Sequence, residues 1–212
     1  MTYYSQIGQD QYYIENIAKR RKGGVFLDIG ANDGLFGSNT AALELDYGWT
    51  GLCIEANPQL ISALTTNRPN SIIAHKAVWT QPGEVTIEVP LQFKKNDPPD
   101  QLGRIVGIER NHSAFKKFFD KGYQTFTVQS DTATNLIQQH LGLPVIIDYM
   151  SLDTEGAEIE ILQSIDFNKI DIKFMTIEHG NRKGMKNKFA EYLLQFGYKV
   201  HRVNEWDIEF EK

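Results

Sequence analysis

Two acidic residues, each placed in or after a short apolar run, are the residues of this chain best suited to holding a ligand. Asp28 lies within the run VFLDI at residues 25–29, and Glu55 ends the run GLCIE at residues 51–55. Gly30 and Gly34 permit the positive φ and the close backbone approach needed where a strand turns into a helix. A carboxylate at the end of the second strand can accept hydrogen bonds from both hydroxyls of a ribose. The spacing therefore predicts a nucleoside-cofactor site.

The glycine spacing indicates which kind of cofactor this is. Glycines stand at positions 30, 34 and 37, which is not the G-x-G-x-x-G order that brings backbone amides against a pyrophosphate. Asp28 and Asp33 make the loop acidic, so it repels phosphates and attracts a cation such as the sulfonium of S-adenosylmethionine. The residues favour methyl transfer over NAD-linked oxidation. A strand-turn-helix connection without a ligand is the alternative, and Glu55 weakens it.

Strands and helices alternate along the chain in a way that brings these acids to one edge of a sheet. The hydrophobic pattern predicts strands at 25–29, 51–55, 71–74, 85–89, 124–128, 145–152 and 172–177, with two more at 198–203 and 206–210. Helices are expected at 35–46, from Pro58 to before Pro69, at 131–140, around 159–162 and at 186–196. Helices between strands require a parallel sheet, and the final hairpin adds an antiparallel edge. The predicted fold class is α/β, with a doubly wound sheet.

Length and charge restrict the function classes. The 212 residues, 41% hydrophobic and 23% charged, suit one domain over residues 1–212. A net charge of −5 argues against nucleic acid as a partner, and we expect no membrane span and a cytoplasmic location. Cys53 is the only cysteine and suits the core. Residues 90–123 break the pattern and carry a basic excess, so we expect an insertion that caps an acceptor site.

Six motifs together resemble the FkbM-type S-adenosylmethionine-dependent methyltransferases. They are SQIGQD (5–10), FLDIGANDG (26–34), IEANP (54–58), HKAV (75–78), DYMSLDTEGAE (148–158) and IEH (177–179), in that family's order. The resemblance implies the Rossmann-like seven-stranded methyltransferase sheet and methylation of hydroxyls on sugars or polyketide-like products. The expected cofactor-binding residues are Gln9, Asp10, Asp28, Gly30, Ala31, Asn32, Gly34, Glu55, Ala56, Lys76, Ala77 and Val78.

Methyl transfer to an alcohol requires removal of its proton, and three residues at strand ends are candidates. His179 is the expected general base, because the unperturbed pKa of imidazole lies near neutrality. Asp153 and Glu178 are further catalytic candidates, and they could instead hold Mg2+, which prefers oxygen ligands and would acidify the acceptor hydroxyl. For Glu158, in the same motif as Asp153, we expect a structural role as a helix-capping residue.

For the acceptor we expect a sugar or glycan, for instance a 6-deoxyhexose such as rhamnose. Arg104, Arg110 and His112 in the insertion are the expected donors to its hydroxyls. The alternatives are O-methylation of a small molecule other than a sugar, and a catalytically silent module that keeps the nucleoside pocket. The sequence does not fix the oligomeric state.

Overall fold

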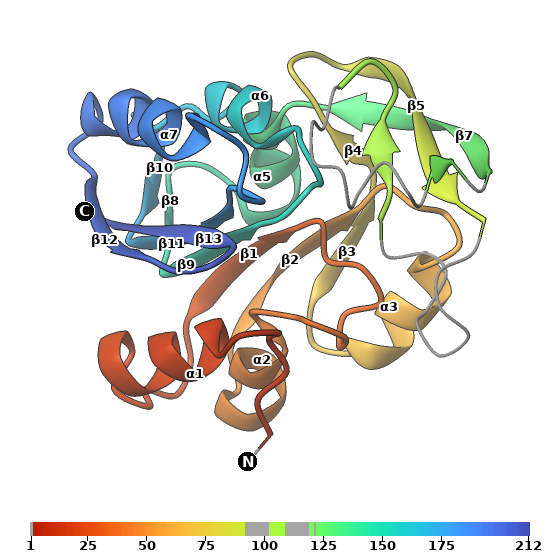
Figure 1. Ribbon diagram of the computed structural model, residues 1–212. Coiled ribbons are helices and arrows are strands. Elements are labelled where there is room, and N and C mark those ends of the chain that lie inside the picture. The colour runs from red at the N-terminus through yellow and green to blue at the C-terminus, as the bar shows by residue number, and fades with distance from the viewer. Residues whose placement is uncertain (1, 92–101, 109–118, 121) are drawn as a thin grey trace.

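Seven strands form the central sheet of the computed structural model, which describes residues 2–91, 102–108, 119–120 and 122–212 (Figure 1). The strand order is β12-β13-β11-β9-β1-β2-β3. Their bounds are β1 (Val25–Ile29), β2 (Thr50–Glu55), β3 (Ile72–His75), β9 (Tyr149–Leu152), β11 (Phe174–Glu178), β12 (Lys199–Val203) and β13 (Asp207–Glu211). Neighbouring strands are parallel except at β13, which runs antiparallel to β11 and β12. The predicted doubly wound sheet with a reversed last strand is confirmed.

Helices cover both faces of this sheet (Figure 1). One face carries α1 (Gln9–Tyr12), the π-helix η1 (Tyr13–Ile17), α2 (Ala41–Tyr47) and α3 (Ile61–Asn67), and the other carries α5 (Ala133–Leu141), α6 (Glu158–Gln163) and α7 (Met185–Leu194). Successive strand residues enter different cores, since Phe26 packs with the first set of helices and Leu27 with the second. Both faces of β1 are therefore buried, which explains why its sequence is nearly all apolar.

A second sheet of four strands lies beside the first, and the sequence did not predict it. Its order is β4-β7-β5-β6, with bounds β4 (Ala77–Val78), β5 (Gly83–Pro90), β6 (Arg104–Ile105) and β7 (Tyr123–Asp131). The antiparallel pairing of β5 with β7 accounts for most of it. β6 lies within residues 90–123, where an insertion is expected, and it pairs with β5, which brings Ile105 opposite Ile87.

Two helices begin later than predicted. In both, short polar side chains accept hydrogen bonds from the backbone N–H groups of the residues expected in the first helical turn. The helix expected at 35–46 starts at Ala41. Before it, Asp33 accepts hydrogen bonds from the backbone N–H groups of Leu35 and Phe36, and Ser38 accepts one from Ala41. These local bonds favour turns over helix. In the same way the segment after Asn57 forms turns, and α3 starts at Ile61 rather than at the preceding proline.

The strand predicted at residues 145–152 is two strands. β8 (Val145–Ile147) pairs with β10 (Ile170–Ile172) in a separate two-stranded sheet, and β9 continues in the main sheet. The break is at Asp148, whose carboxylate accepts a hydrogen bond from the backbone of Val25 and pairs with Arg21. A similar break, at Lys173, separates β10 from β11. Within the described part of the chain, no helix is both long and apolar enough to cross a membrane.

Candidate functional site

The loop after β1 is held against the end of β9 at a distance that only glycine permits. Gly30 has a φ of 85°, and a Cβ atom added there would lie 1.8 Å from the backbone oxygen of Asp153. Asn32 also has a positive φ, 54°, a conformation that asparagine tolerates better than most residues. The backbone N–H groups of Gly30 and Ala31 donate to the backbone oxygen of Ile54, so the loop is fixed at the carboxyl ends of parallel strands, where ligands bind in sheets of this kind.

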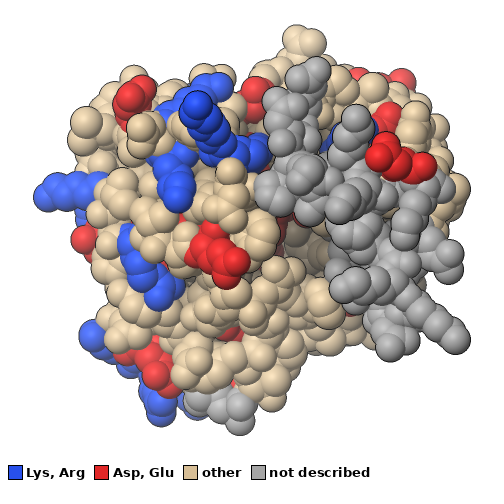
Figure 2. Space-filling model, viewed as in Figure 1, with Lys and Arg blue, Asp and Glu red and all other residues tan. Residues whose placement is uncertain are grey.

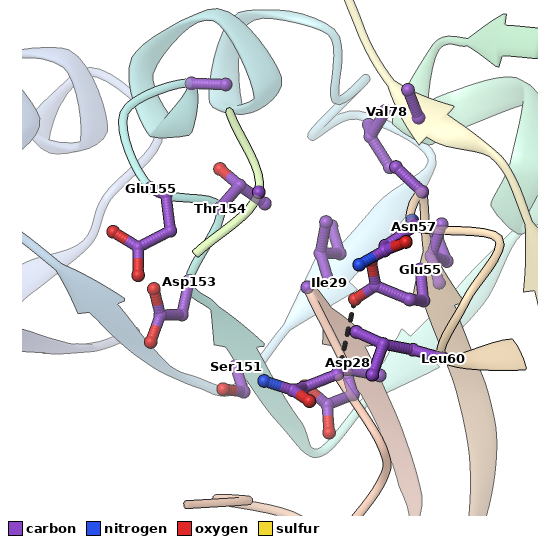
Figure 3. Close-up of a pocket in the computed structure, with 18 of the residues that line it drawn as sticks. Asp28, Ile29, Glu55, Asn57, Leu60, Val78, Ser151, Asp153, Thr154 and Glu155 are labelled. Carbon is purple, nitrogen blue, oxygen red and sulfur yellow. Dashed lines mark hydrogen bonds between the residues drawn. The ribbon is translucent and has the colours of Figure 1, made fainter. Parts of the chain in front are cut away.

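Glu55 ties the two sides of this crevice together (Figure 3). Its Oε2 accepts a hydrogen bond of 2.8 Å from the backbone N–H of Asn32, and its Oε1 accepts one of 2.7 Å from that of Asn57. Desolvation raises the pKa of Glu55, whereas these backbone donors act in the opposite direction. Each carboxylate oxygen has a second lone pair, so the side chain remains able to accept from ligand hydroxyls.

Asp28 lies beneath the loop in a buried network of charged groups. Thr40 donates a hydrogen bond of 2.5 Å to its Oδ2, and Arg68 Nη1 lies 3.6 Å from the same atom. Arg68 also pairs with Glu44 at 2.6 Å, and both of these side chains are fully buried. Burial raises the pKa of Asp28, and the guanidinium opposes that rise. The network fixes the floor of the crevice from below.

A pocket opens above this floor, and most of the predicted cofactor-binding residues line it. We call it the cofactor pocket; the predicted residues in its wall are Asp28, Gly30, Ala31, Asn32, Glu55, Ala56, Lys76, Ala77 and Val78. Apolar contacts come from Ile29, Ile54 and Leu60, which provide flat walls for a base. Sequence reasoning missed Ser38, Asn39, Asn57, Ser151 and Thr154, which are also in the wall. Asn57, Ser151 and Thr154 stand inside the quoted motifs, which was the available signal, whereas Ser38 and Asn39 lie outside them.

Three predicted cofactor residues lie outside this pocket. Gln9 donates a hydrogen bond to Asp207, and the carboxylate of Asp10 accepts hydrogen bonds within its own turn from Tyr4 and Ser5. Gly34 lies against the side chains of α3 and Arg68. The assignment of these three residues to the cofactor therefore stays a prediction, and from the first motif it is Gln6 that lines the pocket.

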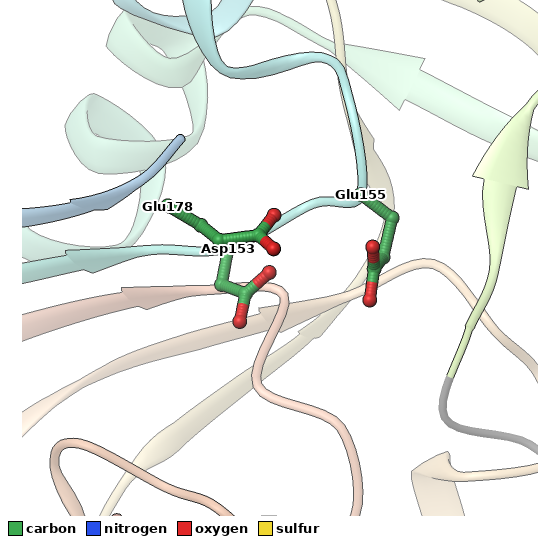
Figure 4. Close-up of side chains that lie close together, drawn as sticks. All are labelled: Asp153, Glu155 and Glu178. Atoms are coloured by element: carbon green, nitrogen blue, oxygen red, sulfur yellow. The ribbon is translucent and has the colours of Figure 1, made fainter. Parts of the chain in front are cut away.

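Three carboxylates meet beside the cofactor pocket (Figure 4). Oxygen atoms of Asp153, Glu155 and Glu178 all lie within 4.8 Å of one another, and we call this group the acidic cluster. Asp153 and Glu155 line the pocket, and Glu178 is buried at the end of β11. The structure brings Asp153 and Glu178 together, as expected from their predicted positions at strand ends. Glu155 was not predicted to join them, because its approach depends on a left-handed φ of 60°.

His179 lies outside the wall of the cofactor pocket. Its ring is buried, its Nδ1 accepts a hydrogen bond of 3.0 Å from the backbone N–H of Asn181, and its Nε2 lies 3.4 Å from the backbone oxygen of Asn204. Burial lowers the pKa of His179, and the charge of Lys186 lowers it further. Both ring nitrogens therefore have backbone partners, and the ring holds two loops together.

Of the predicted acceptor residues, the structure describes Arg104, whereas Arg110 and His112 lie outside the described residues. Arg104 lines the cofactor pocket from β6, and its Nε and Nη2 donate to Glu88 Oε2 at 2.9 and 2.8 Å. Its guanidinium also lies 4.0 Å from the centre of the Phe119 ring. Arg104 is thus held in place at the rim of the pocket.

The motifs in this site match a known family. The sequence profile of the methyltransferase FkbM domain matches residues 28–200, which is most of the chain. The chain belongs to the FkbM methyltransferase family. The resemblance carried by the six sequence motifs is thereby confirmed, and the protein is an S-adenosylmethionine-dependent methyltransferase. None of the curated proteins compared with the chain matches it.

Solved structures support the fold of this FkbM-family protein. The human methyltransferase 10 domain containing protein has a TM-score of 0.51 and 11% identity over 97% of this chain and 82% of that one. A structure described as the delta-N METTL16 MTase domain also has a TM-score of 0.51 and 11% identity, over 97% of this chain and 83% of that one. At this identity the likeness shows the fold alone.

The residues of the cofactor pocket fit S-adenosylmethionine. Glu55 offers carboxylate lone pairs to a ribose, and Ile54, Leu60 and Val78 offer apolar surface to an adenine. The acidic cluster places negative charge at the opposite wall, which favours the positively charged sulfur and amino group of the ligand. Figure 3 shows Asp153 and Glu155 across the pocket from Glu55, so the pocket offers groups that suit each end of the cofactor.

Proposed function

We propose that this protein methylates a hydroxyl of a sugar or glycan. The observation that carries the proposal is the acidic cluster, which lies beside the cofactor pocket with two of its members in the pocket wall. When bound, S-adenosylmethionine supplies an electrophilic methyl group on a positively charged sulfur. An alcohol becomes a competent nucleophile when a base removes its proton, so carboxylates at this place support O-methylation.

We assign the role of base to Asp153. Its side chain is exposed and lines the pocket, so an acceptor hydroxyl can reach it. The carboxylates of Glu178, which is buried, and of Glu155 lie close to it (Figure 4). These two neighbours add negative potential at the position where a cationic sulfur is held. His179 has a positioning role in this proposal, because its nitrogens bond to backbone.

The alternative chemistry for the acidic cluster is coordination of Mg2+. Three carboxylates with oxygens within 4.8 Å of one another offer the hard oxygen ligands that this ion prefers. A bound ion would acidify the acceptor hydroxyl directly. Activity that is lost in EDTA and restored by Mg2+ would support coordination, and activity unchanged by EDTA would support Asp153 as the base.

We further propose that the chain acts as one methyltransferase domain over residues 1–212, with the insertion at residues 90–123 as part of the acceptor site. Support comes from Arg104 and Ile105, which reach the rim of the cofactor pocket from inside that insertion. A 6-deoxyhexose such as rhamnose is a suitable acceptor, because it offers an apolar methyl group together with hydroxyls.

The test uses labelled S-adenosylmethionine with panels of glycans, small phenols, peptides and RNA. Label is expected in glycans, and Asp153→Asn is expected to reduce the rate by about 100-fold or more, the usual contribution of a general base. Glu205→Gln is the matched control, since it removes an exposed carboxylate of the terminal hairpin. Label that enters only RNA, peptides or phenols would refute the sugar assignment.

A further inference from the structure

A second groove lies next to the cofactor pocket and has the opposite charge. We call it the lysine groove; its walls include Trp79, Ile108, Glu160, Lys183, Met185 and Lys188. Residues 106–108 follow directly after β6, whose residues line the cofactor pocket, and Gly156 follows Glu155 of the acidic cluster. In these two segments, residues adjacent in the sequence therefore line the two cavities.

Arg182 builds the partition between the cavities. Its guanidinium donates to the backbone oxygens of Gly156 at 3.2 Å, of Glu178 at 3.1 Å and of His179 at 3.1 Å, and it pairs with the buried carboxylate of Glu158. These bonds connect the start of α6 to the end of β11. Because four of its five N–H donors are already used, Arg182 fixes the wall and leaves ligand binding to its neighbours.

Two lysines of the groove remain available for a ligand. Lys183 and Lys188 are exposed, and neither has an ion-pair partner among the described residues. Lys186 adds a further positive charge in the same stretch, residues 181–188, which contains no acid. In the space-filling view, Lys and Arg side chains gather over α7 and its start (Figure 2). This gathering produces a local positive field on a protein whose net charge is −5.

The remaining walls suit a sugar ring. Trp79 is half-buried and lines the groove, and an indole face packs well against the apolar side of a sugar. Glu160 is half-buried in the same wall, and its Oε2 is a buried acceptor with no hydrogen-bond donor in the described structure. Such an atom is suited to a ligand hydroxyl, since an unsatisfied buried acceptor is costly. The lysine ammonium groups, the indole of Trp79 and the carboxylate of Glu160 thus line one cavity.

We propose that the lysine groove binds the acceptor through a phosphate ester, so that the substrate is a phosphorylated sugar. Lys183 and Lys188 would hold the phosphate, Trp79 and Glu160 would hold the sugar, and the reacting hydroxyl would extend over the partition toward Asp153. This inference rests on the proposed function for the chemical step, but it makes its own claim about binding. A small phosphate ester fits better than RNA, because the groove holds few cations and also contains a carboxylate.

Calorimetric titration of the full chain, saturated with S-adenosylhomocysteine, tests binding without any methyl transfer. The probes are glucose 1-phosphate, a nucleoside diphosphate glucose, glucose, and a short single-stranded RNA. Both phosphorylated sugars are expected to bind at least tenfold more tightly than glucose, and more weakly as salt is raised. The phosphorylated sugar that binds more tightly shows whether the groove prefers a phosphate monoester or a diphosphate.

The double variant Lys183→Gln/Lys188→Gln is expected to weaken binding of the phosphorylated sugars at least tenfold and to leave affinity for S-adenosylhomocysteine unchanged. The control, Lys22→Gln/Lys199→Gln, removes the same charge from exposed lysines outside the groove. Equal affinities of the two double variants, equal binding of glucose and its phosphate, or tight binding of RNA alone would each overturn the inference. Lysine-dependent binding of a phosphorylated sugar, with no label entering any sugar or glycan of the panel, would instead support the groove and refute the proposed methylation.

Discussion

Asp207 gives the sharpest test of how this site is built, because it is a buried acid beside other acids. It lies opposite Glu178 in the pairing of β11 with β13, and its exposed fraction is 4%. Burial and the charge of Asp153 raise its pKa to about 7, against the opposing hydrogen bonds from Gln9 and Asn204. The native protein therefore holds Asp207 protonated well above the pH at which the unfolded chain ionises.

The sign of the effect on stability follows from this difference. Below about pH 4 both states are protonated, and Asp207 makes no difference. Above that pH the unfolded chain ionises first, so the native state loses relative stability until the pH passes the native pKa of about 7. Integrating the proton difference from pH 5 to pH 7 gives a fall of about 2 kcal/mol in the free energy of unfolding from this one group.

The assay is urea denaturation of the wild type, Asp207→Asn and Glu205→Gln at several values between pH 5 and pH 8. Because asparagine does not titrate, the stability of Asp207→Asn relative to wild type is expected to increase by about 2 kcal/mol from pH 5 to pH 7. Glu205→Gln, two residues away and exposed, is expected to show no such trend. A constant difference between Asp207→Asn and wild type would refute the argument that Asp207 is protonated in the native state.

Three further perturbations test separate parts of the site. Glu55→Gln is expected to weaken binding of S-adenosylhomocysteine roughly tenfold, because a charged acceptor for hydroxyls is lost, and unchanged affinity in calorimetry would remove Glu55 from the site. Arg68→Met is expected to lower the free energy of unfolding by about 3 kcal/mol, since it leaves buried carboxylates unpaired, and a loss in urea denaturation below about 1 kcal/mol would contradict that network. His179→Gln is expected to keep turnover within about tenfold of wild type; a fall of about 100-fold in labelled-methyl transfer would return the role of base to His179.

The sequence predicts the central strands and the cofactor motifs because local and global requirements agree there. β1 and β2 are buried on both faces, so their residues form apolar runs, with Asp28 next to last in β1 and Glu55 last in β2. Gly30 is required by contact with the backbone of Asp153, and this close approach has a signature in the sequence, namely a glycine after a strand. Glu55 is likewise recognisable from its position at the next strand end.

Features that depend on contacts distant in the sequence could not be predicted. Gln6, rather than Gln9 or Asp10, reaches the cofactor pocket because the turn that contains them is tied to Ser5 and Asp207. β6 is two residues long and forms only through pairing with β5, so no periodicity marks it. The approach of Glu155 to Asp153 requires a left-handed backbone that glutamate seldom adopts. In each case a long-range partner determines the local conformation.

The negative charge of the acidic cluster and the positive charge of the lysine groove have complementary roles in the two proposals. The acidic cluster attracts the cationic methyl donor, but the same carboxylates repel a phosphorylated acceptor. An anionic acceptor can then approach only if a separate positive surface holds its phosphate away from Asp153, and Lys183 and Lys188 lie across the partition from it. The reacting hydroxyl is neutral and is the part of such a substrate that the acidic cluster admits. Charge separation across Arg182 would therefore select both the substrate and its orientation.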